Sequence, residues 1–141
     1  MKYYINIGSN LGNRLLNISK AVSAIEKCFG WFELSKTVES EPWGFDSTHK
    51  FLNIGMLFIS DREPTDVLHE LQRIERRLSP SSHRTADGSY ADRVLDIDIM
   101  AVDGIEMHTD ELTLPHPHLR ERPFFFGPYQ ELLEKSSGLQ E

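Results

Sequence analysis

Two aspartates at alternate positions, Asp96 and Asp98, are the residues of this sequence best suited to chemistry. They lie in a run typical of a β-strand, where residues two apart share a face with Cβ atoms about 7 Å apart. Two such carboxylates repel each other unless a cation lies between them, and their hard oxygens suit Mg²⁺ that also binds phosphate. The alternative is an acidic strand face open to solvent, although strands otherwise disfavour aspartate.

A second group lies in the proline-rich segment 113–122, which contains His116, Arg120 and Arg122. A guanidinium can bind phosphate through two parallel hydrogen bonds. The prolines on both sides of His116 stiffen the segment. The alternative is a basic loop that pairs with the abundant acidic residues. A zinc site at His116 and His118 is disfavoured because no third soft ligand lies nearby.

A third group combines the motif Glu-Pro-Trp-Gly at 41–44 with Phe51 and Asn53. Aromatic rings and an amide are what a flat heteroaromatic ligand needs, because rings stack on its faces and an amide hydrogen-bonds its edge. A loop folded around a buried tryptophan is the alternative interpretation.

Two weaker features have mainly structural interpretations. Residues 8–12, Gly-Ser-Asn-Leu-Gly, precede a helix and could cradle a phosphate, but they lack the Gly-Lys-Ser/Thr of a P-loop. We expect an ordinary strand-to-helix turn there. Cys28, the only cysteine, has no base beside it and is expected to lie in the core.

Hydrophobic spacing indicates the elements that must position these groups. Apolar residues recur every three or four positions in helices and every second position in half-buried strands. We therefore expect strands at 3–8, 31–40, 51–60 and 93–102, helices at 15–29, 64–78 and 129–135, and a long polar loop at 79–92.

This order predicts an α+β fold of the ferredoxin-like βαββαβ class, an antiparallel sheet with helices on one face and the active site on the open face. On the third strand, Leu52, Ile54, Met56 and Phe58 should face the helices, and Phe51, Asn53 and Gly55 should face away. On the last strand, Leu95, Ile97, Ile99 and Ala101 should face the helices, and Asp96 and Asp98 should face away.

Composition sets the outer limits. The 141 residues suit one domain, 1–141, and a lone cysteine excludes a disulfide framework. A net charge of −7 argues against nucleic-acid binding. No apolar run is long enough to span a membrane, and the N-terminus lacks a signal-peptide pattern. We expect a cytoplasmic monomer that acts on small molecules.

Taken together, the motifs resemble the 6-hydroxymethyl-7,8-dihydropterin pyrophosphokinase family of folate biosynthesis. The matching stretches follow the family's order over nearly the whole chain: INIGSNLGNR, EPWG, FLN, QRIE, RVLDIDIM and LPHPHLRERPF. The resemblance implies transfer of pyrophosphate from ATP to the pterin's hydroxymethyl oxygen, with release of AMP and with two Mg²⁺ ions.

The resemblance also implies roles for individual residues. Asp96 and Asp98 match the metal-binding acids and, with Arg84 and Arg93, are the expected catalytic residues. Pterin-binding positions match Ser40, Trp43, Phe51, Asn53, Tyr90 and Phe124. ATP-binding positions match Gln72, Glu75, Arg93, Ile99, Thr113, His116 and Arg122.

The sequence departs from the family mainly in the loop at 79–92, which in the family closes over the substrates. A family Gly-Arg appears as Ser-Pro at 79–80, a loop tryptophan as Tyr90 and a loop arginine as Ser89. We expect Arg84 to be the loop's main phosphate contact. A family arginine near the ATP ribose appears as Glu111.

Two other functions remain as alternatives. A relative that binds pterin or nucleotide without efficient transfer would be consistent with the altered loop, but not with the retained aspartate pair. A ferredoxin-like interaction module, for example for RNA, is disfavoured because the acidic pair would repel phosphate.

Overall fold

The computed structural model describes residues 1–43, 47–79 and 94–137. Its elements are β1 (Lys2–Ser9), α1 (Arg14–Phe29), β2 (Phe32–Leu34), β3 (Val38–Ser40), β4 (Phe51–Ile59), α2 (Pro64–Leu78), β5 (Asp96–Val102), β6 (Met107–His108), β7 (Thr113–Leu114) and α3 (Pro123–Ser136). The chain is a mixed α/β protein with an antiparallel main sheet, as the sequence predicts. No helix in these ranges is long and apolar enough to span a membrane.

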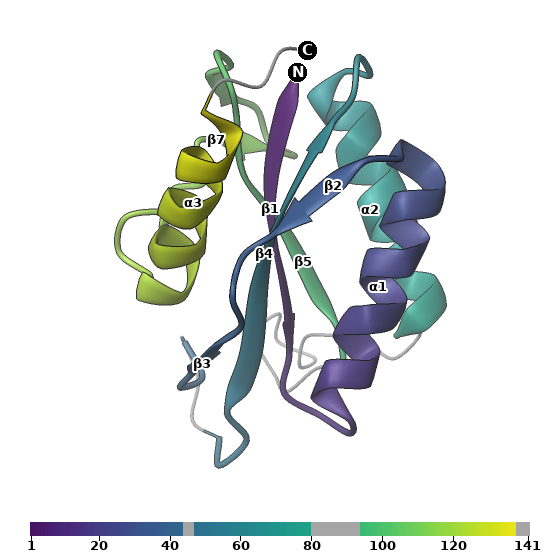
Figure 1. Ribbon diagram of the computed structural model, residues 1–141, viewed down its shortest axis with the longest axis vertical. Coiled ribbons are helices and arrows are strands. Elements are labelled where there is room, and N and C mark those ends of the chain that lie inside the picture. Colours follow the sequence, from purple (N-terminus) through teal and green to yellow (C-terminus); the bar gives the residue numbers. More distant parts are fainter. Residues whose placement is uncertain (44–46, 80–93, 138–141) are drawn as a thin grey trace.

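The main sheet has the strand order β2-β4-β1-β5, and β3 also pairs with β4. Figure 1 shows α1 and α2 side by side on one face of this sheet. The first strand lies between two antiparallel partners, β4 and β5, so β5 forms an edge. Strands β6 and β7 form a separate two-stranded sheet.

The predicted third element, 31–40, is two short strands rather than one. Leu34 pairs with Met56 and Val38 pairs with Asn53, so three residues stand opposite two. Ser35 lies at this irregularity, where its hydroxyl oxygen accepts the Gly55 N–H at 2.8 Å. A side chain thus replaces the backbone acceptor that a continuous strand would supply.

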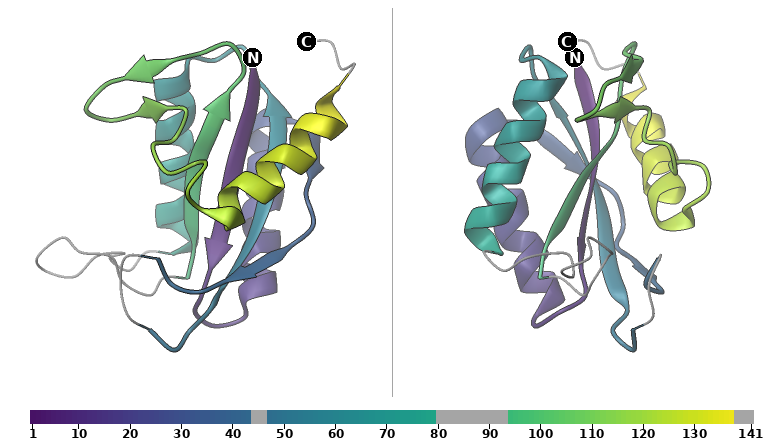
Figure 2. Two further views of the ribbon diagram at one scale, coloured as in Figure 1. Left: turned by 90° about the vertical axis from the view of Figure 1, so that its left-hand side faces the viewer. Right: turned by 180° about the vertical axis from the view of Figure 1, so that it is seen from behind.

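The face opposite α1 and α2 is not open, which corrects the sequence prediction. Helix α3 packs across it against β4 and β1, as both views of Figure 2 show. It begins at Pro123, well before the predicted 129–135. A Cβ atom at Gly55 would lie 2.9 Å from Leu132 and Pro128, so the glycine allows α3 to lie directly on the backbone of β4.

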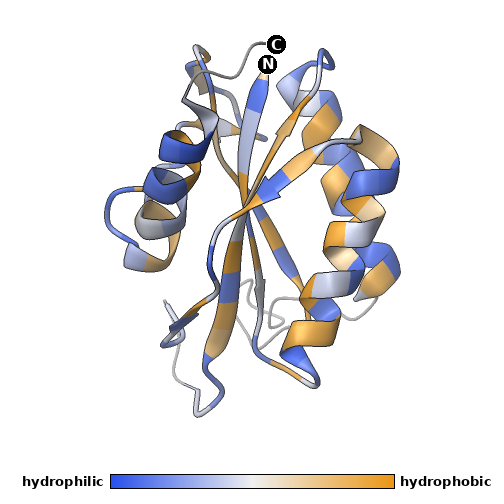
Figure 3. Cartoon of the chain, in the orientation of Figure 1, coloured by the Kyte–Doolittle hydropathy of each residue, from blue (hydrophilic) through white to orange (hydrophobic). Residues whose placement is uncertain are grey.

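The sheet therefore separates two hydrophobic clusters. The larger one lies beneath α1 and α2 and contains Ile54, Met56, Phe58, Ile97 and Ile99, as expected. The smaller lies beneath α3; its buried members are Tyr4, Leu57, Met100, Ala101, Leu119, Phe125 and Leu132. Figure 3 shows the apolar residues on the inner sides of the helices and along the strands.

Two sequence predictions about single residues are wrong. Tyr4 pairs with Ala101 and Ile5 with Ile99, which leaves Met100 as an extra residue in β5. This bulge turns Ala101 to the α3 side of the sheet. Cys28 is exposed. The side of α1 that faces the core carries Ile18, Ile25 and then Phe29, so Cys28 lies just outside it.

Candidate functional site

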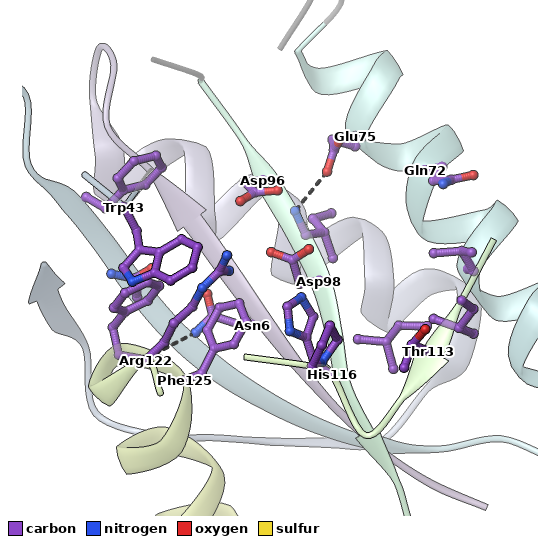
Figure 4. Close-up of a pocket in the computed structure, with 18 of the residues that line it drawn as sticks. Asn6, Trp43, Gln72, Glu75, Asp96, Asp98, Thr113, His116, Arg122 and Phe125 are labelled. Atoms are coloured by element: carbon purple, nitrogen blue, oxygen red, sulfur yellow. Dashed lines mark hydrogen bonds between the residues drawn. The ribbon is translucent and has the colours of Figure 1, made fainter. Parts of the chain in front are cut away.

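A cavity of about 640 Å³ contains most of the predicted site residues. It lies beside the exposed end of β5 and reaches from the α3 side of the sheet around the edge to α2, so it is not confined to the face opposite the helices (Figure 4). The predicted residues that line it are Trp43, Phe51, Asn53, Gln72, Glu75, Asp96, Asp98, Ile99, Thr113, His116, Arg122 and Phe124.

The remaining predicted residues fall into two groups. Ser40 does not line the cavity but binds a residue that does. Arg84, Tyr90 and Arg93 lie outside the described residues, as does the loop to which Arg84 and Tyr90 belong.

The aspartate pair lies at the centre of the cavity. Before the bulge, β5 alternates strictly, so Asp96 and Asp98 share the face opposite Ile97 and Ile99. Both side chains are half-buried, and Figure 4 shows both carboxylates turned toward the cavity. In the described ranges no group of three or more typical metal-binding side chains is found. Two hard carboxylates fit a Mg²⁺ site that is completed by water and phosphate oxygens.

Glu75 secures the edge strand between these two aspartates. Its Oε2 accepts the backbone N–H of Ile97 at 2.8 Å. Because β1 is the one partner of β5 among the described strands, this N–H points out of the sheet and would otherwise need water. The α2 carboxylate therefore fixes the strand segment that carries Asp96 and Asp98.

His116 is held as a neutral hydrogen-bond donor. Its backbone N–H donates to Met100 O at 2.8 Å, and its Nδ1 accepts the His118 N–H at 3.0 Å. Burial, with smaller effects of Arg122 and His118, lowers the pKa of His116 to about 4. With Nδ1 accepting, the remaining proton lies on Nε2.

Arg122 is the buried cation of the site. It is only 7% exposed, and its guanidinium carbon lies 4.1 Å from the centre of the Trp43 ring and 4.9 Å from that of Phe125. Its Nε is buried and has no hydrogen-bond partner among the residues that the structure describes. Arg120, which the sequence grouped with it, is exposed, stacks on Phe126 at 5.3 Å and does not line the cavity.

One end of the cavity is rich in aromatic rings and amides. The Asn53 side-chain nitrogen donates to Val38 O at 3.1 Å and to Ser40 Oγ at 2.9 Å. These bonds fix the amide and direct its oxygen away from β3. At Gly8, a Cβ atom would lie 3.0 Å from that oxygen, so the glycine makes room for it. Phe51 is buried alongside.

Sequence reasoning missed Asn6, which belongs to this end. It pairs with Asp98 across the sheet, is buried, and donates to Phe124 O at 2.9 Å. The signal was present, since Asn6 is a polar residue between Ile5 and Ile7 in a strand. Its link to the site depends on strand register, which the sequence does not reveal.

The other end is formed by α2 and the turn between β6 and β7. Gln72 and Thr113 line it, together with Glu111. The Glu111 carboxylate pairs with His69 of α2 at 2.6 Å, and both side chains are about half exposed. The position where the family's arginine is expected thus carries a glutamate that contacts a histidine of α2 across the mouth of the cavity.

Residues 8–12 comprise the end of β1 and the turn that leads to α1, as the sequence predicts. Asn13 caps α1 by accepting the Leu16 N–H, and Asn17 donates to Leu11 O and Ser9 Oγ. No residue from 8 to 12 lines the cavity.

Comparison with known proteins agrees with this geometry. Residues 4–134 match the family described as 7,8-dihydro-6-hydroxymethylpterin-pyrophosphokinase. A 2-amino-4-hydroxy-6-hydroxymethyldihydropteridine pyrophosphokinase of Porphyromonas gingivalis is 38% identical over 131 residues, 92% of this chain and 88% of the relative. Proteins of the same name from Aquifex aeolicus and Bacillus subtilis are 30% and 28% identical, over 92% and 94% of this chain and 78% of each relative. The chain therefore belongs to the 7,8-dihydro-6-hydroxymethylpterin-pyrophosphokinase family.

Proposed function

We propose that this protein transfers pyrophosphate from ATP to the hydroxymethyl oxygen of 6-hydroxymethyl-7,8-dihydropterin. The products are AMP and the pterin diphosphate, and the reaction is a step of tetrahydrofolate biosynthesis. The observation that carries the proposal is the joining, in one cavity, of an aromatic and amide end, a central carboxylate pair and a second polar end. Family membership and the names of the relatives support the same reaction.

The pterin is assigned to the aromatic and amide end. Because both Asn53 nitrogen protons are used inside the protein, its fixed oxygen would accept an N–H from the pterin edge. Phe124, half-buried at the cavity wall, would stack on the ring. Flat, donor-rich rings would be favoured over saturated ligands of the same size.

ATP is assigned to the other end, between α2 and the β6–β7 turn, with its triphosphate toward β5. Gln72 and Thr113 would contact the nucleoside part. The neutral imidazole of His116 would donate its Nε2–H to a phosphate oxygen, and the Arg122 guanidinium would bind another. These donors are fixed before ATP arrives, which favours electrostatic stabilisation of the transferring group.

The carboxylates of Asp96 and Asp98 are assigned as the ligands of two Mg²⁺ ions. When bound, the ions supply positive charge that offsets the triphosphate. Glu75 keeps the two carboxylates in place through Ile97 N–H, and the half-buried setting limits competition from water. The attacking hydroxymethyl oxygen would approach the β-phosphorus opposite the leaving AMP oxygen.

We also infer the finer properties that the sequence predicts. The strand order β2-β4-β1-β5 and the alternation of helices with strands support a ferredoxin-like core within one domain. A cytoplasmic monomer that acts on small molecules and does not bind nucleic acid agrees with a net charge of −7.

The deciding experiment measures AMP release by the purified protein with ATP and Mg²⁺, with and without hydroxymethyl-dihydropterin. The proposal predicts AMP only when the pterin is present, in equal amount to pterin diphosphate. Pterin or nucleotide binding without AMP release would favour the alternative of a relative that has lost efficient transfer. If the protein neither binds pterin, nor binds nucleotide, nor releases AMP, both the proposed transfer and the alternative are refuted.

A further inference from the structure

The surroundings of Arg122 raise a question that its proposed role does not answer. A guanidinium keeps its charge at any ordinary pH, and burial of a charge is costly unless a partner compensates it. Arg122 is 93% buried, yet within 1–43, 47–79 and 94–137 it has no carboxylate at ion-pair distance. Something other than an ion pair must stabilise this cation.

Aromatic rings surround the guanidinium instead. Trp43 is the nearest, at 4.1 Å from the guanidinium carbon to the ring centre, while Phe125 and Phe124 lie at 4.9 Å and 5.8 Å. Tryptophan gives the strongest attraction of a cation to a ring, and the attraction increases when water is excluded. Figure 4 shows the guanidinium beside the Trp43 indole and within the same cavity as Asp96 and Asp98.

Contacts with residues other than Arg122 also hold Trp43 in place. Its ring packs against His118 with centres 4.7 Å apart, and His118 Nδ1 lies 2.8 Å from Glu121. Although Trp43 is 38% exposed, it therefore has a defined position. It also lies three residues beyond Ser40, whose hydroxyl accepts a hydrogen bond from Asn53, so one short segment contacts both Asn53 and Arg122.

We propose that Trp43 is a positioning residue that holds the Arg122 guanidinium ready for the triphosphate, in addition to its expected place in the pterin pocket. Without the indole, water would reach the guanidinium and the flexible arginine side chain would lose its single orientation. Nucleotide binding would then have to reorder the side chain at the expense of affinity. This inference rests on the proposed function only for the identity of the anion.

The test measures nucleotide affinity in the absence of pterin, because a role confined to the pterin pocket would leave that affinity unchanged. The probe is α,β-methylene-ATP with Mg²⁺, whose bridging carbon prevents transfer, titrated by calorimetry. Trp43→Leu should weaken binding on the order of 10-fold, whereas Trp43→Phe, which keeps a ring, should recover most of the loss. Trp31, a half-exposed tryptophan outside the cavity, provides the control Trp31→Leu, which should bind as the wild type does.

A second measurement remains available if Trp43→Leu does not fold. The chain has two tryptophans, so in Trp31→Phe the fluorescence reports on Trp43 alone. Binding of α,β-methylene-ATP should change that emission until the site is saturated. The dissociation constant from this titration should equal the one measured by calorimetry. Adding Arg122→Met to the Trp31→Phe protein should abolish the change even at analogue concentrations that saturate the variant by calorimetry, because the indole then no longer contacts the cation that meets the phosphates.

The outcomes separate the two proposals. Equal or tighter nucleotide binding by Trp43→Leu, or an emission response that survives Arg122→Met, would overturn the positioning role and leave the proposed function intact. Failure of the wild type to bind the analogue at all would overturn both.

Discussion

The two ends of the cavity are built differently. At the aromatic and amide end, Asn53 and Asn6 are buried and each is fixed by hydrogen bonds to neighbouring backbone or side-chain atoms. At the end beside α2, Gln72 is exposed, and the pair of His69 with Glu111 is about half exposed. Selection between similar heterocycles requires fixed polar groups, since a mismatched ligand leaves them unpaired. The first end is built to choose its ligand, and the second to accommodate one.

The central carboxylates serve both ends, and their loss should have the largest effect. Asp96→Asn or Asp98→Asn removes one negative charge from the proposed Mg²⁺ site while keeping the side-chain shape. We expect turnover to fall by about 10²-fold or more, because charge compensation at the transferring phosphate is the main contribution to catalysis. Circular dichroism should remain that of the wild type. Turnover near the wild-type value at saturating Mg²⁺ would contradict the metal assignment.

A substitution at the aromatic and amide end should have the next largest effect. Asn53→Ala leaves an N–H of the pterin without its acceptor, at a cost of about 1–3 kcal/mol in pterin affinity. Calorimetry with the oxidised pterin and, separately, with α,β-methylene-ATP provides the comparison. Pterin affinity should fall while nucleotide affinity stays within about 2-fold. Equal losses for both ligands would indicate that Asn53 supports the fold of the cavity and not one of its ends.

How much of this the sequence reveals depends on the range of the interactions. Asp96 and Asp98 were predictable because strand alternation alone places them on one face. The orientation of Ala101 toward α3 was not predictable, because the bulge at Met100 depends on the register between β5 and β1. Asn6 was missed for the same reason.

Helix α3 was anticipated only at its C-terminal part. Pro128 lies inside the helix, buried against β4 at Gly55. A proline inside a helix costs a hydrogen bond, and here tertiary packing outweighs that local preference. The packing of α3 on the sheet is a long-range contact that no local pattern predicts. It covers this face of the sheet and brings aromatic rings around Arg122.

The pH dependence of stability tests the state of His116. Its pKa of about 4 in the folded protein lies below the unfolded value of 6.5, so the unfolded chain binds more protons between these limits. This contribution to stability is fully present above pH 6.5 and is lost as the pH falls toward 4. His116→Asn should therefore show a smaller loss of unfolding free energy between pH 7 and pH 5 than the wild type, measured with urea.

The control for this experiment is His108→Asn, which changes an exposed histidine of β6. It should retain the wild-type difference between the two pH values. An identical difference in His116→Asn would mean that the imidazole is not held neutral in the folded protein.

The smallest effect is expected from substitutions at the end beside α2. Glu111→Gln and His69→Gln each alter the His69–Glu111 contact between α2 and the β6–β7 turn, whose two side chains are about half exposed. Such pairs contribute about 0–1 kcal/mol and are screened by salt. Thermal unfolding should therefore change little at low salt and not measurably at high salt. Nucleotide affinity should change by at most about 3-fold, because the pair closes no buried contact. A loss of nucleotide affinity as large as the pterin loss in Asn53→Ala, and one that persists at high salt, would show that this end is as rigidly built as the other. In that case the His69–Glu111 pair would be part of a selective contact to the nucleotide, and the contrast between the two ends would fail.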